Sequence, residues 1–195
     1  MWLRSLLAPY RRSLSTLRVV PPSRDSPTSL ALPLCFVQLA PAPITDPNPE
    51  RSWSRWIDKF TTRGYTCLVV DLDPSSSSSS ELVSTLTQAT PFPPLVFASR
   101  AACIVAEEYV SSHALSGLVL DRPHGPGNDF DYEPHFPVAV IVRDLDDDQQ
   151  HRLVRDLARD QDQDDDEDGF VRRIVSRGDD DDFKDVMEWM DENGL

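Results

Sequence analysis

One stretch of the sequence carries residue types that could do chemistry at a turn between a strand and a helix. Residues 94–98 are apolar and predict a buried strand, and residues 101–112 predict a helix. Ser99 and Arg100 stand between these two segments, among small side chains. A serine at the tip of such a turn can present its hydroxyl as a nucleophile. The chemistry of this chain therefore depends on which residue occupies the tip.

Apolar runs alternate with amphipathic segments along the rest of the chain. The runs predict strands over 34–40, 65–72, 94–98, 115–120, 137–142 and 170–176, and helices over 52–63, 81–89, 101–112, 149–159 and 182–193. The strands are apolar throughout, which is typical of a parallel sheet that is covered on both faces. We expect an α/β three-layer sandwich with a mostly parallel sheet of about six strands. Any site should then lie at the carboxyl ends of the strands.

The order of these segments resembles the α/β-hydrolase fold. The stretches "RGYTCLVVDLD", "PLVFASRAACIVAEEYV", "LSGLVLDRP" and "FPVAVIVRDLDD" follow one another as their counterparts do in that family. The resemblance covers residues 34–195 and implies an α/β-hydrolase-like domain. The first two strands of the family are absent or very short, and its lid is absent or very short. The resemblance therefore implies a trimmed, degenerate member.

The family places its nucleophile at the centre of a Gly-x-Ser-x-Gly turn. In the best register this pattern falls on residues 98–102, so Ala98, Ala101 and Ala102 supply the small side chains and Arg100 replaces the nucleophile. A guanidinium stays protonated and cannot attack a carbonyl carbon. A shift of one residue would place Ser99 at the tip, but it would also place the bulky Phe97 where a small residue is needed.

The other catalytic positions also depart from the family. Asp179 stands where the resemblance implies the histidine base, and a carboxylate is a weaker base toward a hydroxyl. Asp146 follows the fifth predicted strand, where the family acid is expected; its alternative role is that of a solvated carboxylate near a helix N-terminus. Prolines 41 and 43 remove two backbone N–H donors where an oxyanion loop needs them.

The first 24 residues differ in composition from the rest. They contain five arginines, four serines and no acidic residue, with leucines near helical spacing. This composition is typical of a mitochondrial transit peptide, and the alternative is a basic tail. We expect a transit peptide at 1–24, a linker at 25–33 and import into the mitochondrion, most simply into the matrix.

The charge of the chain restricts its partners. The formal net charge is −14, and residues 1–24 carry five positive charges, so the remainder carries −19. Such a chain repels nucleic acids and anionic lipids and favours basic protein partners. No apolar run reaches about 18 residues, so we expect no transmembrane segment. A small-molecule ligand is compatible with this charge.

Metal and cofactor motifs are weak. Residues 164–169 read D-x-D-x-D-G, as in a calcium loop, but the twelfth position holds Val175 rather than glutamate. The four histidines lack metal-ligand spacing, and no glycine-rich phosphate loop occurs. The Trp53, Trp56 and Phe60 stripe is typical of a helix core rather than a ligand cage. We expect no metal and no cofactor.

The three cysteines (Cys35, Cys67 and Cys103) lie inside apolar runs without a paired spacing. They predict buried thiols in a reducing compartment rather than disulfides. Cys103 follows the turn, and a thiol nucleophile at this position is a third, weaker hypothesis.

Two functions compete. The first is a mitochondrial α/β-hydrolase-like protein that has lost catalysis and acts as an interaction or assembly factor. The alternative is a small esterase-like serine hydrolase that uses Ser99 and Asp146, with a base supplied by His124 or His135.

Overall fold

The computed structural model describes residues 15–39, 53–73, 79–123, 135–143, 151–153 and 171–195. These residues form strands β1 (Thr16–Val20), β2 (Pro33–Leu39), β3 (Thr66–Leu72), β4 (Leu95–Ser99), β5 (Gly117–Asp121), β6 (Val138–Val142) and β7 (Val171–Val175). Their helices are α1 (Ser54–Thr62), α2 (Ser79–Ala89), α3 (Ala102–Val110) and α5 (Asp179–Glu192). From β2 to β5 strands therefore alternate with helices, as the sequence predicts, whereas most of the predicted helix 149–159 lies outside the described residues.

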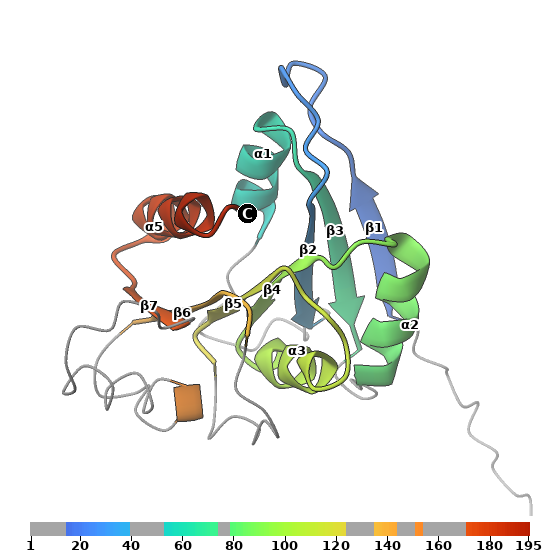
Figure 1. The fold of residues 1–195 in the computed structure, drawn as a ribbon, viewed down its shortest axis with the longest axis vertical. Helices are drawn as coiled ribbons and strands as arrows, with labels where there is room; N and C mark the ends of the chain where they lie inside the picture. The colour runs from blue at the N-terminus through green and yellow to red at the C-terminus, as the bar shows by residue number, and fades with distance from the viewer. Residues whose placement is uncertain (1–14, 40–52, 74–78, 124–134, 144–150, 154–170) are drawn as a thin grey trace, which may run out of the picture.

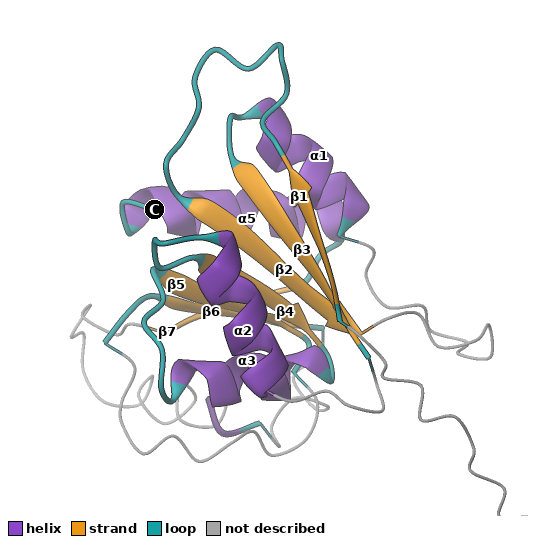
Figure 2. Ribbon diagram, turned by 90° about the vertical axis from the view of Figure 1, so that its right-hand side faces the viewer, coloured by secondary structure: helices purple, strands orange, loops and turns teal. Residues whose placement is uncertain are grey.

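The seven strands form one sheet in the order β1-β3-β2-β4-β5-β6-β7. All neighbouring strands are parallel except β1, which pairs with β3 in antiparallel orientation. The helices α1 and α5 cover one face of the sheet, and α2 and α3 cover the other (Figures 1 and 2). The predicted α/β three-layer sandwich with a mostly parallel sheet is confirmed at this level.

The seventh strand is β1, which the sequence analysis does not anticipate. Its residues lie within the segment 1–24 that the composition assigns to a transit peptide, and the expected domain began only at residue 34. The strand is mostly exposed, with Leu17 and Val19 among the exposed large hydrophobic residues. It therefore lacks the continuous apolar pattern that marks the buried strands.

The connection from β1 to β2 packs against the C-terminal end of α1. The backbone N–H of Ser23 donates to the carbonyl of Thr61, and the N–H of Leu30 donates to that of Gly64, each at 2.9 Å. Gly64 has a φ of 103°, and a Cβ at this position would lie 2.2 Å from the carbonyl oxygen of Thr28. Gly64 thus ends α1, as the sequence predicts. Because it has no side chain, it also lets the β1–β2 connection lie close to the backbone at the end of α1.

Each face of the sheet has its own hydrophobic core. On the α1 and α5 face, Trp53, Trp56 and Phe60 pack with Phe36 and Phe97, so this stripe of α1 is core, as expected from its helical spacing. The core on the other face joins alternate strand residues to buried side chains of α2 and α3. The burial of both sheet faces explains why the strands are apolar throughout.

Candidate functional site

The turn between β4 and α3 places Arg100 at the position with an unusual backbone. Arg100 has a φ of 50°, in the left-handed region that side chains rarely adopt. Its N–H donates to the carbonyl of Asp121 at 2.9 Å, and the N–H of Cys103 donates to the carbonyl of Arg100 at 3.0 Å. These bonds hold the sharp reversal from strand to helix. A positive φ at this point is the strained geometry that a nucleophile-bearing turn requires.

The residues around Arg100 satisfy the steric demands of the turn. Ala98 and Ala102 are fully buried against the α2 and α3 core, and Ala101 is exposed. Larger side chains at 98 or 102 would have to displace that core. Small residues were expected here from the sequence pattern alone.

Ser99 is the last residue of β4 and is only 1% exposed. Its Oγ has no hydrogen-bond partner among the described residues. Side chains alternate along a strand, so Ser99 lies on the same face as Phe97, which is the α1 and α5 face. A hydroxyl that is bonded to no imidazole lacks a base to activate it as a nucleophile.

A buried ion pair lies beside Ser99. Asp121 is the register partner of Ser99 on β5, and its side chain is fully buried. Arg122 donates from Nη2 to Oδ2 of Asp121 at 2.9 Å and from Nε to the two carboxylate oxygens at 3.2 and 3.3 Å. Arg122 also has a positive φ, of 51°. No role for this pair is predicted from the sequence, although a charged pair directly after an apolar strand is a usable signal.

More polar side chains continue along the carboxyl edge of the sheet. Gln38 donates from Nε2 to Asp71 at 2.6 Å, and the Thr16 hydroxyl donates to the same carboxylate at 3.2 Å. The carboxylates Asp71 and Asp121 are therefore already occupied by donors from within the fold.

Asp179, which stands at the expected base position, is the first residue of α5. Its Oδ1 accepts a hydrogen bond from the indole N–H of Trp56 at 2.9 Å. The neighbouring Asp180 accepts from Lys59 at 2.6 Å, and this contact lowers the pKa of Asp180. Both bonds join α5 to α1. These contacts give the first turn of α5 a structural task, and carboxylates here also complement the positive end of the helix dipole.

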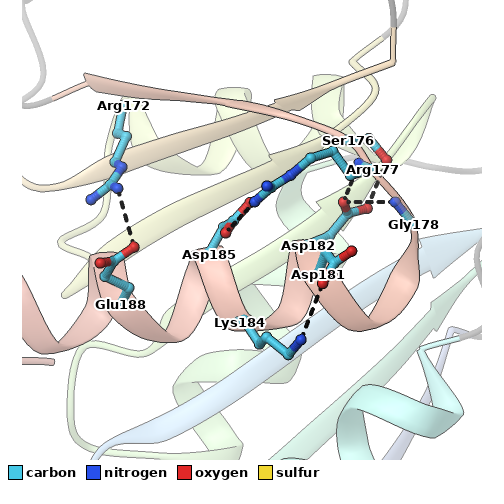
Figure 3. Close-up of polar contacts among 9 residues, drawn as sticks. All are labelled: Arg172, Ser176, Arg177, Gly178, Asp181, Asp182, Lys184, Asp185 and Glu188. Carbon is cyan, nitrogen blue, oxygen red and sulfur yellow. Dashed lines mark hydrogen bonds and ion pairs between the residues drawn. The ribbon is translucent and has the colours of Figure 1, made fainter.

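Asp182 closes the junction between β7 and α5 (Figure 3). It is fully buried and accepts bonds from the Ser176 hydroxyl at 2.7 Å and from the backbone N–H groups of Arg177 and Gly178 at 2.9 and 3.3 Å. The sequence predicted α5 from residue 182, but the helix begins one turn earlier, at Asp179. The reason is that the carboxylate of Asp182 satisfies donors of the preceding loop from inside the first turn.

His151 forms an ion pair away from this turn. His151 Nε2 is 2.8 Å from Glu107 Oε1, and both side chains are almost completely buried. Glu107 belongs to α3, on the sheet face opposite to Ser99. His135 is exposed, whereas His124 and Asp146 lie outside the described residues. No hydrogen bond joins Ser99 to a histidine in the part of the chain that the structure describes.

Cys103 is a buried residue of α3. Its Sγ donates to the carbonyl of Ala98 at 3.5 Å and weakly to that of Asp121 at 3.9 Å. Burial, reinforced by the charges of Asp121 and Glu107, raises its pKa well above the usual thiol value. A thiol in this environment stays protonated, so it is a poor nucleophile.

Among the described residues no group of three or more side chains could hold a metal ion. None of the described helices is both long and apolar enough to span a membrane. The sequence matches no protein-family model and no curated protein. The residues at the carboxyl edge of the sheet must therefore carry the functional argument by themselves.

Proposed function

We propose that this chain is an α/β-hydrolase-like protein without hydrolytic chemistry, which acts in mitochondria by binding a protein partner as an interaction or assembly factor. The observation that carries the proposal is the positive φ of Arg100 in the turn between β4 and α3. This backbone geometry belongs to the residue that such a turn presents. Here that residue is a permanently charged guanidinium, which cannot act as a nucleophile.

Two further residues support the proposal. Ser99, the nearest hydroxyl, is buried at the end of β4, and its Oγ lacks a partner in the described part of the fold. Asp179, at the position of the base, is engaged by the indole of Trp56. A hydrolytic centre needs a nucleophile and a base within hydrogen-bond reach of each other, and these two residues do not supply one.

The charge of the protein indicates the chemistry of its partner. The net charge of −14 includes exposed carboxylates on α5, namely Glu188, Asp191 and Glu192. A surface of this sign speeds association with basic surfaces and disfavours acidic ones. We infer a basic protein partner.

Catalysis is tested with a fluorophosphonate probe, which labels activated serines. The wild-type protein and the Arg100→Ser variant should both stay unlabelled, next to an active serine hydrolase as positive control. Arg100→Ser should also show no ester hydrolysis, because Asp179 replaces the base. Labelling of wild type that disappears in Ser99→Ala would instead establish a serine hydrolase.

The partner is tested by crosslinking in isolated mitochondria. We expect the 22.0 kDa chain to form an adduct with a different protein, and the adduct should weaken as the salt concentration rises. Recovery of the chain only as an uncrosslinked monomer, or its absence from mitochondria, would contradict this part of the proposal.

A further inference from the structure

Three buried hydrogen-bond donors near the carboxyl edge of the sheet have no acceptor. They are the indole Nε1 of Trp53, the Oγ of Ser99 and the Nη1 of Arg122, and none has a partner among the residues that the structure describes. Trp53 and Ser99 are each 1% exposed, and the Arg122 side chain is 10% exposed. A buried polar group without a partner costs about 1–3 kcal/mol, so three in one region call for an explanation.

The strand register and the ring contacts place these donors on one face of the sheet. Trp53 packs on Phe97, with ring centroids 6.0 Å apart, and Phe97 lies two residues before Ser99 on the same face. Asp121 is the neighbour of Ser99 on β5, and neighbouring strands lie about 4.8 Å apart. The Arg122 guanidinium is bonded to this carboxylate. All three donors therefore belong to the region where β4 and β5 end, under the start of α1.

The nearby carboxylates are bonded to other donors. Asp121 accepts from Nε and Nη2 of Arg122, which leaves Nη1 on the opposite side of the guanidinium fork. Asp71 accepts from Gln38 and Thr16, and Asp179 accepts from Trp56. Within the described residues, these carboxylates bond other groups, while an indole N–H, a hydroxyl and a guanidinium N–H have no acceptor.

The position of these donors fits a ligand site. The order of the parallel strands reverses between β2 and β4, and ligands of open α/β sheets bind beyond the carboxyl ends of the strands at such a point. Because α3 directly follows β4, its N-terminal end lies at this edge of the sheet, and its first turn contains no acidic residue and no side-chain cap. The aromatic rings of Phe36, Phe97 and Trp56 surround Trp53 and would exclude water from a bound group.

We propose that this region binds a small oxyanion, a carboxylate or phosphate group, which accepts hydrogen bonds from Trp53, Ser99 and Arg122. An oxyanion has only acceptor atoms, and its charge matches the guanidinium and the end of α3. The site is distinct from the protein-binding role proposed above and does not depend on it. It gives the hydroxyl of Ser99 a binding task rather than a nucleophilic one.

The test follows the indole N–H signals of the full chain by two-dimensional NMR while propionate or inorganic phosphate is added, with sodium chloride at matched ionic strength as the control. The Trp53 signal, assigned from Trp53→Phe, should shift and saturate with at least one of the two anions. The signals of Trp56 and Trp189 should move much less. If propionate is the anion that saturates, the ligand class is a carboxylate; if phosphate saturates, it is a phosphate.

Matched variants separate the site from general effects of the fold. Ser99→Ala and Trp53→Phe should each weaken anion binding at least fivefold, as measured by titration calorimetry. Trp189→Phe should leave the affinity within twofold, because Trp189 belongs to α5 and is not among the aromatic residues that pack on Trp53 in the described part of the fold. Equal shifts with chloride, equal shifts with neutral propionamide, or unchanged affinity in Ser99→Ala and Trp53→Phe would overturn the proposal. None of these results alters the outcome of the fluorophosphonate experiment.

Discussion

The hydroxyl of Ser176 donates to the buried carboxylate of Asp182 at 2.7 Å, and this contact joins the end of β7 to the first turn of α5 (Figure 3). The same carboxylate accepts the backbone N–H groups of the two residues that follow Ser176. Asp182 therefore fixes the entry of α5, the helix that carries Asp179 to Trp56.

Replacement of Asp182 should strongly destabilise the fold. Asp182→Ala removes a buried carboxylate and leaves three partly buried donors without their acceptor, and we expect a loss of about 3 kcal/mol in the free energy of unfolding. The matched control is Asp181→Ala, which removes a surface ion pair with Lys184 and should cost less than about 1 kcal/mol. Urea unfolding of the two variants measures the difference. Similar losses in both would show that the buried contacts of Asp182 are not decisive.

The positive φ of Arg100 predicts that glycine stabilises the fold more than alanine at this position, the reverse of the order expected inside a helix. A residue with a side chain pays about 1 kcal/mol or more in this region, so Arg100→Gly should be more stable than Arg100→Ala by about 1 kcal/mol. At Ile104, an exposed position inside α3, alanine should instead be more stable than glycine by about 1 kcal/mol. The same order at both positions, measured by chemical unfolding, would disprove the left-handed turn.

The three buried thiols should make stability depend on pH in the alkaline range. Burial raises the pKa of Cys67 to about 12, and it also raises the pKa values of Cys35 and Cys103. In the unfolded chain thiols ionise near pH 8.5, whereas in the folded protein they stay neutral. Stability is therefore full below about pH 8 and falls as the pH rises further, by up to about 1.4 kcal/mol per pH unit for each thiol.

Urea unfolding between pH 7 and pH 9.5 checks this dependence, and Cys67→Ser should make the slope shallower. Native protein should also resist iodoacetamide at pH 8, while the unfolded chain reacts at all three cysteines. Rapid alkylation of Cys103 in the folded state would support the hypothesis that its thiol acts as a nucleophile.

Two truncations should differ in stability although both remove basic residues. Deletion of residues 2–14 leaves β1 intact and should change Tm by only a few degrees, at about 2–4 °C per kcal/mol. Deletion of residues 2–24 also removes β1, the partner of β3, and should lower Tm by more than about 5 °C. Calorimetry distinguishes the two. Because β1 lies inside the segment 1–24 that composition assigns to a transit peptide, we expect any cleavage on import to fall upstream of Thr16 instead. A mature chain that begins at residue 25 would contradict this prediction and support the boundary expected from composition.

Sequence reasoning reached most of the fold because the buried strands are apolar on both faces. Runs such as the one in β2 and the helical stripe of Trp53, Trp56 and Phe60 are local signals that need no tertiary information. The strand β1 was not predicted because its residues are mostly exposed and lie in a basic segment of the sequence. Its place in the sheet comes from pairing with β3, a contact more than forty residues away that no local pattern encodes.

By itself, the sequence favoured a guanidinium over a hydroxyl at the centre of the turn after β4, and it places an aspartate rather than a histidine after Gly178. Only the tertiary structure decided what the neighbouring groups do. It buries Ser99 beside the Asp121–Arg122 pair, bonds Asp179 to the indole of Trp56, and leaves three donors without acceptors among the described residues. Such outcomes depend on which distant side chains meet when the strands align, because hydrogen bonds act over about 3 Å and not along the chain.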